Sequence, residues 1–205
     1  MAKKLLTLGE DGSMVMRLPG GQIQSLPKSE QAYAYLLIDC SSSMDGNKIL
    51  QAKEGAIVFA QEAVKKEYCV GLIRFSDTAE VLSSLSQESP ALISKLHLLE
   101  PDGGTNMTDA LNLAIRELST VSGRRAIVIA TDGAPNSVDS SLYAAQRAKD
   151  LGIDIIAIGT DDADQDFLAR LATRSDLSVK VPSKYLKSSI SEAVQLLPSA
   201  ARRNR

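Results

Sequence analysis

The sequence predicts an α/β fold: a doubly wound, mostly parallel sheet with one antiparallel edge strand and helices on both faces. Two observations support this prediction. Apolar runs of strand length are almost continuous, as in parallel strands covered on both sides, at residues 34–38, 68–75, 125–131 and 153–159. Stretches with the apolar spacing of amphipathic helices alternate with these runs, which is typical of right-handed strand–helix–strand crossovers.

The first predicted helix follows the first strand and covers residues 47–66, with apolar residues at helical spacing: Ile49, Ala52, Ala56, Phe59 and Ala63. Later helices are expected at residues 91–99, 108–121, about 140–150, 164–173 and 184–197. Ser89 and Pro90 are predicted to cap and start the second of these helices, and Pro101 to end it. The short polar stretch 77–86 adjoins the second strand, which favours an edge strand entered by a tight hairpin.

Composition limits the classes of partner. A chain of 205 residues with 44% hydrophobic content fits one sizeable core. The 23 basic residues are balanced by 25 acidic ones, so there is no broad positive field to bind nucleic acid. The apolar runs are far shorter than the roughly 20 residues that cross a bilayer, and acidic residues precede any signal-peptide core. We therefore expect a cytoplasmic protein with neither nucleic acid nor membrane as partner.

The chain is expected to divide into residues 1–30, 31–198 and 199–205. The first part is predicted to be an N-terminal arm or a hairpin around Pro-Gly-Gly at 19–21, packed on the domain that follows. The last part is predicted to be a flexible basic tail. Cys40 and Cys69 flank apolar segments without metal-ligand spacing, which indicates reduced, buried thiols.

Oxygen-bearing side chains gather where the predicted strands end. Asp39, Ser41 and Ser43 follow the first strand, Asp132 follows the strand at 125–131, and Thr105 lies just ahead of a helix. Acidic and hydroxyl residues are also common in turns and helix caps. However, ligands of doubly wound sheets bind at the carboxyl ends of the strands near the switch point. We expect all five residues to meet at this edge.

These motifs resemble those of the von Willebrand factor A domain family. DCSSS at 39–43 fits its Asp-x-Ser-x-Ser pattern, GGT at 103–105 its threonine loop, and TDG at 131–133 its distal aspartate. The resemblance covers roughly residues 32–197 and implies a Rossmann-like fold and a stand-alone bacterial type, similar to those that work beside chaperone-like ATPases, kinases and phosphatases. It also implies a metal-ion-dependent adhesion site. There Ser41, Ser43 and Thr105 would ligate the ion through hydroxyl oxygens, with Asp39 and Asp132 acting directly or through waters.

The chemistry of this residue set supports the same function. An all-oxygen set without His or Cys suits Mg2+ or Mn2+. Because only two of the five residues are carboxylates, the ion would stay electrophilic, and a Glu or Asp of a partner could complete its shell. The sequence therefore predicts a metal-dependent protein–protein interaction module. Gly103 and Gly104 either let the threonine loop approach closely or form a simple turn.

Two alternatives stay open. A phosphotransfer hydrolase of the haloacid dehalogenase type also places an aspartate after the first strand, but it needs a second aspartate two residues on, where this chain has Ser41. No nucleotide-binding glycine motif supports catalysis either, so we expect no enzyme. The other alternative is a structural interaction domain with a vestigial site. Asp109 could orient a metal-bound water or stabilise a helix start, Met44 is expected in the core, and His97 in a structural role.

Overall fold

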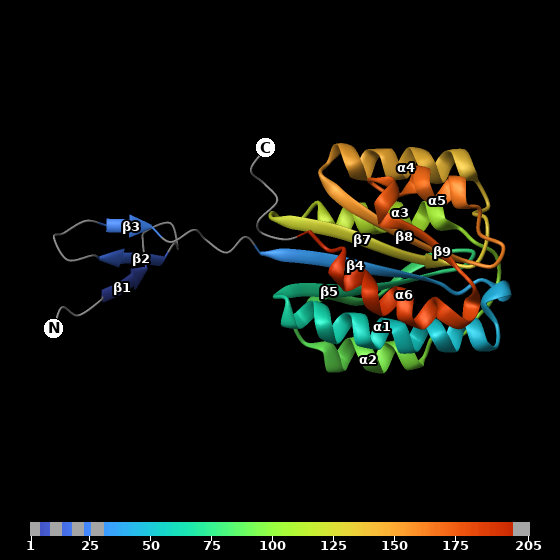
Figure 1. Ribbon diagram of the computed structural model, residues 1–205, viewed down its shortest axis with the longest axis horizontal. Coiled ribbons are helices and arrows are strands. Elements are labelled where there is room, and N and C mark those ends of the chain that lie inside the picture. The colour runs from blue at the N-terminus through green and yellow to red at the C-terminus, as the bar shows by residue number, and fades with distance from the viewer. Residues whose placement is uncertain (1–4, 9–13, 18–22, 26–30, 199–205) are drawn as a thin grey trace. The chain divides into compact units, whose positions relative to one another are not determined.

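Figure 1 shows the protein as a computed structural model that describes residues 5–8, 14–17, 23–25 and 31–198. The chain divides into two compact units, Met1–Glu30 and Gln31–Arg205. The predicted basic tail, residues 199–205, lies outside the described residues.

The first unit contains a three-stranded antiparallel sheet with the order β1-β2-β3. Its strands are β1 (Leu5–Leu8), β2 (Met14–Arg17) and β3 (Ile23–Ser25). β2 and β3 pair on either side of the Pro-Gly-Gly stretch, with Arg17 opposite Ile23. β1, which the sequence did not predict, pairs with β2. The expected packing of this segment on the larger unit stays a prediction.

The second unit is built on a six-stranded sheet with the order β6-β5-β4-β7-β8-β9. Its strands are β4 (Ala32–Asp39), β5 (Tyr68–Phe75), β6 (Ala79–Ser86), β7 (Arg124–Thr131), β8 (Ile153–Thr160) and β9 (Ser178–Val181). All neighbouring pairs are parallel except β5 and β6. The predicted fold class, including the antiparallel edge strand, is confirmed. The sequence did not predict β9, a short edge strand without a fully buried residue.

Helices cover both faces of this sheet. They are α1 (Asn47–Lys65), α2 (Ser89–His97), α3 (Met107–Leu118), α4 (Val138–Asp150), α5 (Gln165–Leu171) and α6 (Leu186–Glu192). Figure 1 shows α1, α2 and α6 on one face and α3, α4 and α5 on the other. The cap predicted at Ser89 is wrong: Glu88 is the N-cap, and Ser89 is the first helical residue. The last predicted helix is split, because 3-10 turns flank α6 at Ser183–Tyr185 and Ala193–Gln195.

The core lies between the sheet and the two helical layers. Every residue from Ala34 to Asp39 at the end of β4 is buried, as the continuous apolar run predicts. A Cβ added to Gly71 would lie 2.2 Å from the ring of Tyr35, so only glycine fits at this point of β5. Met44 is fully buried, as predicted. Within the described residues, no helix has the length and apolar character to span a membrane.

Candidate metal centre

The predicted ligands come from loops at the carboxyl edge of the sheet. Asp39 is the last residue of β4, and Asp132 directly follows the neighbouring strand β7. The chain leaves β4 toward α1 and β5 on one side, while β7 lies on the other side, so this edge is the switch point of the sheet. Ser41 and Ser43 lie in the loop from β4 to α1, which includes the 3-10 turn Ser42–Met44. Thr105 lies in the loop before α3.

Asp39 forms the buried floor of the site. The backbone N–H of Ser41 donates to its Oδ1 at 2.8 Å, and the hydroxyl of Thr131 donates to its Oδ2 at 2.5 Å. Burial raises the pKa of Asp39; these hydrogen bonds counteract that rise in part, and the negative charge of Asp132 adds to it. Asp39 is thus a carboxylate held in a fixed orientation at a cost in folding stability.

Ser41, Ser43 and Asp132 form a continuous chain of oxygens. The Oγ atoms of Ser41 and Ser43 are 3.1 Å apart, and the hydroxyl of Ser43 donates to Oδ1 of Asp132 at 2.8 Å. Ser41 and Asp132 are buried, whereas Ser43 is exposed. The structure therefore brings the first and third sequence motifs together, and Ser43 is the member of this chain that faces solvent.

The threonine loop joins the other two loops through its backbone. The amide of Thr105 donates to Oδ1 of Asn136 at 2.9 Å, and the amide of Asn136 donates back to the carbonyl of Thr105 at 2.9 Å. The carbonyl of Gly103 accepts hydrogen bonds from the amide and the hydroxyl of Ser42, at 3.0 and 3.1 Å. Thr105 itself is 9% exposed. These bonds bring all three motifs to one edge.

The two glycines of this loop allow a close approach to Asp77, a residue that the sequence analysis missed. Gly103 has φ 68°, and a Cβ there would lie 2.4 Å from Oδ2 of Asp77. The amide of Gly104 donates to Oδ1 of the same carboxylate at 2.8 Å. The φ value of Gly103 is one that a turn requires. The glycines thus form a turn whose backbone approaches the side chain of Asp77 in the loop after β5, while close approach to a ligand stays a prediction.

Asp109 belongs to the start of α3. Its amide donates to Oδ1 of the N-cap residue Asn106 at 3.3 Å, and its carboxylate accepts from Nδ2 of Asn106 at 2.9 Å. This reciprocal pair is a helix cap, which favours the stabilising role over the metal-bound water. His97 is exposed at the end of α2, and its carbonyl accepts from Nζ of Lys53 at 3.2 Å.

The side chain of Lys48, which lies in the first turn of α1, reaches the site. Its Nζ lies 2.7 Å from Oδ2 of Asp132 and 3.5 Å from Oδ2 of Asp161, which follows β8. Burial lowers the pKa of Lys48, but the hydrogen bond and charge of Asp132 outweigh burial and raise it overall. A signal was present in the sequence, because a lysine in the first turn of a helix opposes the helix dipole and needs acidic partners.

The oxygen spacings fit a hard cation. At the roughly 2.0–2.1 Å that Mg2+ prefers, neighbouring ligands of an octahedron lie about 2.9 Å apart. The two spacings along the chain Ser41–Ser43–Asp132 are 3.1 and 2.8 Å. Across the described part of the chain, no group of three or more His, Cys, Asp or Glu residues is placed to hold a metal ion. That finding agrees with a set of only two carboxylates, in which the other donors are hydroxyls.

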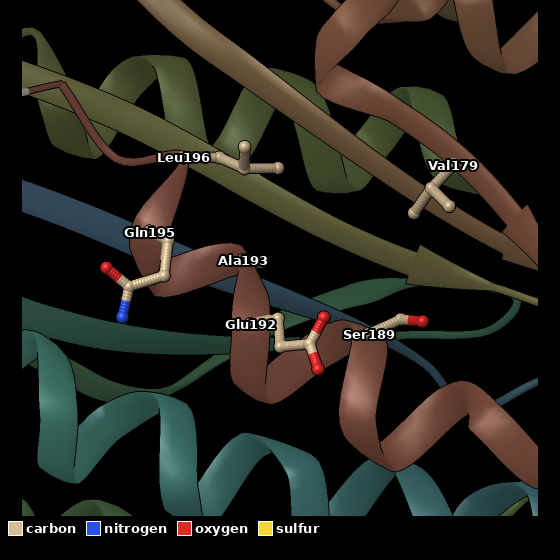
Figure 2. A pocket seen from close by; sticks show the side chains of 6 residues that line it. All are labelled: Val179, Ser189, Glu192, Ala193, Gln195 and Leu196. Carbon is tan, nitrogen blue, oxygen red and sulfur yellow. The ribbon is translucent and has the colours of Figure 1, made fainter.

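Two surface hollows lie elsewhere on this unit. One, of about 420 Å³, lies between β9 and the last helical segment, and Figure 2 shows Val179 facing it across from Ser189, Glu192 and Leu196. The other, of about 550 Å³, is lined by Asp161, Gln165, Lys180, Val181 and Pro182. Asp161 links the second hollow to Lys48 and so to the oxygen cluster.

Comparison with known proteins identifies a family and several relatives of this chain. The family described as von Willebrand factor type A domain matches residues 35–195. The collagen alpha-4(VI) chain of Mus musculus is 27% identical over 159 residues, which are 71% of this chain but 6% of that protein. This chain thus spans a small part of that curated relative.

Solved structures share the fold at low identity. The vWF domain of the type V pili tip protein Mfa5 from Porphyromonas gingivalis has a TM-score of 0.74 at 14% identity, covering 82% of this chain and 95% of that one. Proximal thread matrix protein 1 from the mussel byssus, in a structure with a zinc-occupied MIDAS motif, has a TM-score of 0.68 at 18% identity. The match covers 82% of this chain and 46% of the mussel chain.

Proposed function

Because the chain belongs to the von Willebrand factor type A domain family, we propose that it is a metal-dependent protein–protein interaction module. It binds an acidic residue of a partner protein through Mg2+ or Mn2+ at the carboxyl edge of its sheet. The observation that carries this proposal is the convergence of oxygen-bearing side chains from separate loops at the switch point of the sheet, where Ser43 is hydrogen-bonded to both Ser41 and Asp132, at 3.1 and 2.8 Å.

Five residues would hold the ion. Ser41, Ser43 and Thr105 offer neutral hydroxyl oxygens, while Asp39 and Asp132 act directly or through bound waters. Both oxygens of Asp39 are already engaged by protein donors, the amide of Ser41 and the hydroxyl of Thr131. Both oxygens of Asp132 also accept from protein donors, the hydroxyl of Ser43 and the ammonium of Lys48, so either carboxylate would reach the ion directly or through a water. The mussel structure with a zinc-occupied MIDAS motif supports a divalent ion at this place in the fold.

The arrangement also favours an acidic ligand. When bound, the ion supplies an electrophilic position that a partner carboxylate can fill. Asp39, Ser41 and Asp132 lie on the buried side of the cluster, whereas Ser43 is exposed. A partner Glu or Asp would therefore approach from the side of Ser43. We further propose a cytoplasmic, bacterial setting in which the partner is a protein of a chaperone-like ATPase, kinase or phosphatase system.

A capture experiment tests the function as a whole. The full chain is immobilised, and partners are captured from a lysate in Mg2+ and, in parallel, in excess chelator. The double variant Ser41→Ala, Ser43→Ala serves as the matched bait with an incomplete site. Proteins that bind only to the intact bait in Mg2+ support the proposal. A partner that is retained equally in chelator and on the double variant would contradict a metal-mediated contact.

A further inference from the structure

The side chain of Lys48 sits between two carboxylates at the edge of the candidate metal centre. Its Nζ is 2.7 Å from Oδ2 of Asp132 and 3.5 Å from Oδ2 of Asp161. The side chains of Lys48 and Asp161 are 21% and 31% exposed, whereas that of Asp132 is 1% exposed. The ammonium group is thus the cation that compensates the buried carboxylate of Asp132.

The position of Lys48 at the start of its helix is unfavourable for a positive charge. Lys48 lies in the first turn of α1, which holds no acidic residue. The positive end of the helix dipole disfavours a cation at this point. Lys65, at the far end of the same helix, has the favourable placement and pairs with Glu62 at 2.7 Å. Lys48 is therefore held in place by the two carboxylates of the site and not by its own helix.

Asp132 has no oxygen free of protein donors. The hydroxyl of Ser43 donates to Oδ1 at 2.8 Å, and the ammonium of Lys48 occupies Oδ2. A divalent ion and an ammonium group repel each other when they share one carboxylate, and the buried position of Asp132 strengthens this repulsion. Binding of an ion to Asp132 therefore favours departure of the ammonium from Oδ2.

Asp161 is the second position that the ammonium can occupy. It has a positive φ of 44°, and its Oδ1 accepts from the amide of Ser183 at 3.2 Å, so its carboxylate is held at the edge of the site. It also lines the open hollow of about 550 Å³ beside Lys180. A small rotation of the flexible lysine side chain would move the ammonium fully onto Asp161 without a change in the backbone.

From this geometry we infer that Lys48 is an internal competitor for the metal ion: its ammonium neutralises Asp132 in the metal-free protein and shifts to Asp161 when the ion binds. The inference rests on the proposed function. It adds that Lys48 and Asp161 together set the affinity of the site for the metal ion. Asp39, Asp132 and Asp161 together with Lys48 carry two net negative formal charges, which one divalent cation neutralises. The exchange keeps Asp132 paired in both states and weakens the affinity of the site for metal.

Calorimetric titration of the full chain with MgCl2 and MnCl2 at one ionic strength tests this inference. We expect Lys48→Met to bind both ions roughly tenfold more tightly than the wild type, because a close competing charge is removed. The matched control is Lys65→Met, on the same helix but exposed, which should leave the affinity unchanged. In chelator, Lys48→Met should melt at a lower temperature than the wild type, since Asp132 is left without its cation. If that variant does not fold, Lys48→Gln, which keeps a hydrogen-bond donor, carries the same expectation.

Asp161→Asn tests the shift itself through a double-mutant cycle. In the wild-type background it should weaken metal binding roughly fivefold, and in Lys48→Met less than twofold, because only the ammonium needs the second carboxylate. Equal losses of affinity in both backgrounds would mean that Asp161 affects the ion only through its own negative charge. That result would contradict the shift of the ammonium to Asp161. If the wild type binds metal but neither Lys48 variant binds more tightly, the inference fails and the proposed function stands. If wild type and variants all fail to bind either ion, both are wrong.

Discussion

The hydroxyl of Ser43 donates to Oδ1 of Asp132 at 2.8 Å across 89 positions of sequence. The two residues meet because β4 and β7 are parallel neighbours, with Ile38 opposite Ala130, so the loops after these strands emerge side by side. This contact joins a rim residue to a buried carboxylate.

Divalent ions should stabilise the fold. Addition of Mg2+ or Mn2+ at about ten times the dissociation constant contributes about 1.4 kcal/mol of linkage free energy. For a domain of this size, the melting temperature should rise by roughly 3–5 °C and return to its starting value in chelator. Differential scanning fluorimetry with each ion, with CaCl2 for comparison, measures the shift. Identical melting curves under all conditions would argue strongly against the site.

The double variant Ser41→Ala, Ser43→Ala should lose this ion-dependent shift while keeping the fold. Ser43 is exposed. Ser41 is 2% exposed and contacts Ser43, so the Ser41 side chain is buried although it lies in a loop. Each lost hydrogen bond should lower the free energy of unfolding by about 1 kcal/mol. The matched control is Ser83→Ala, Ser84→Ala on the edge strand β6, which should keep the full shift. Retention of the shift in the site variant would exclude the two serines as ligands.

Asp39→Asn should stabilise the metal-free protein and abolish metal binding. Burial is the main cause that raises the pKa of Asp39 above its usual value. The charged form of Asp39 is therefore disfavoured in the folded state. Removing that charge at neutral pH should therefore raise the melting temperature in chelator, which differential scanning fluorimetry of the two proteins compares. A lower melting temperature would mean that the hydrogen bonds from Ser41 and Thr131 outweigh the burial of the charge.

Thr105→Ala should weaken partner binding more than metal binding. Thr105 comes from a separate loop, and the hydrogen bonds that hold this loop to its neighbours use backbone groups of Thr105 and Gly103. The variant should therefore keep the loop in place and lose one hydroxyl ligand. We expect Mn2+ affinity to fall about threefold and affinity for a peptide with a single glutamate, titrated in Mn2+, about tenfold.

Calorimetry measures both affinities of the Thr105 variant. The control is Thr120→Ala, in the turn that follows α3. Equal losses of metal and peptide affinity would make Thr105 one ligand among others, without a special role in the response to the acid. Peptide binding by the wild type that persists in chelator would contradict the metal-mediated contact.

The protein should show no phosphoester hydrolysis above background. A hydrolase of the aspartate-based type needs an acid two residues after its nucleophile, and here that residue is Ser41, whose amide is used to hold Asp39. Asp39 is also fully buried, with both oxygens hydrogen-bonded. A generic aryl phosphate in Mg2+ is the test substrate. Turnover that disappears in Asp39→Asn would overturn the interaction-module proposal in favour of catalysis.

The sequence by itself determined most of the sheet. The strands β4, β5, β7 and β8 were predicted because each is nearly continuous in apolar residues, a pattern that burial on both faces requires. The edge strand β9 was missed because it is short and contains no fully buried residue, so it lacks that pattern. The order and spacing of three short motifs also placed Asp39, Ser43 and Asp132 at one edge, since parallel strands end together.

Only the tertiary structure decided which groups neutralise and position one another. Lys48 and Asp132 are 84 positions apart, and Asp161 joins them from the end of β8. Helical spacing places Lys48 on a polar face but does not say which carboxylate its long side chain reaches. Apolar patterning records whether a side chain is buried. The pairing of charges depends instead on the distance between them in space, because the Coulomb energy of a pair falls as its two charges move apart. The partners of a charged side chain are therefore known only once the loops are folded against one another.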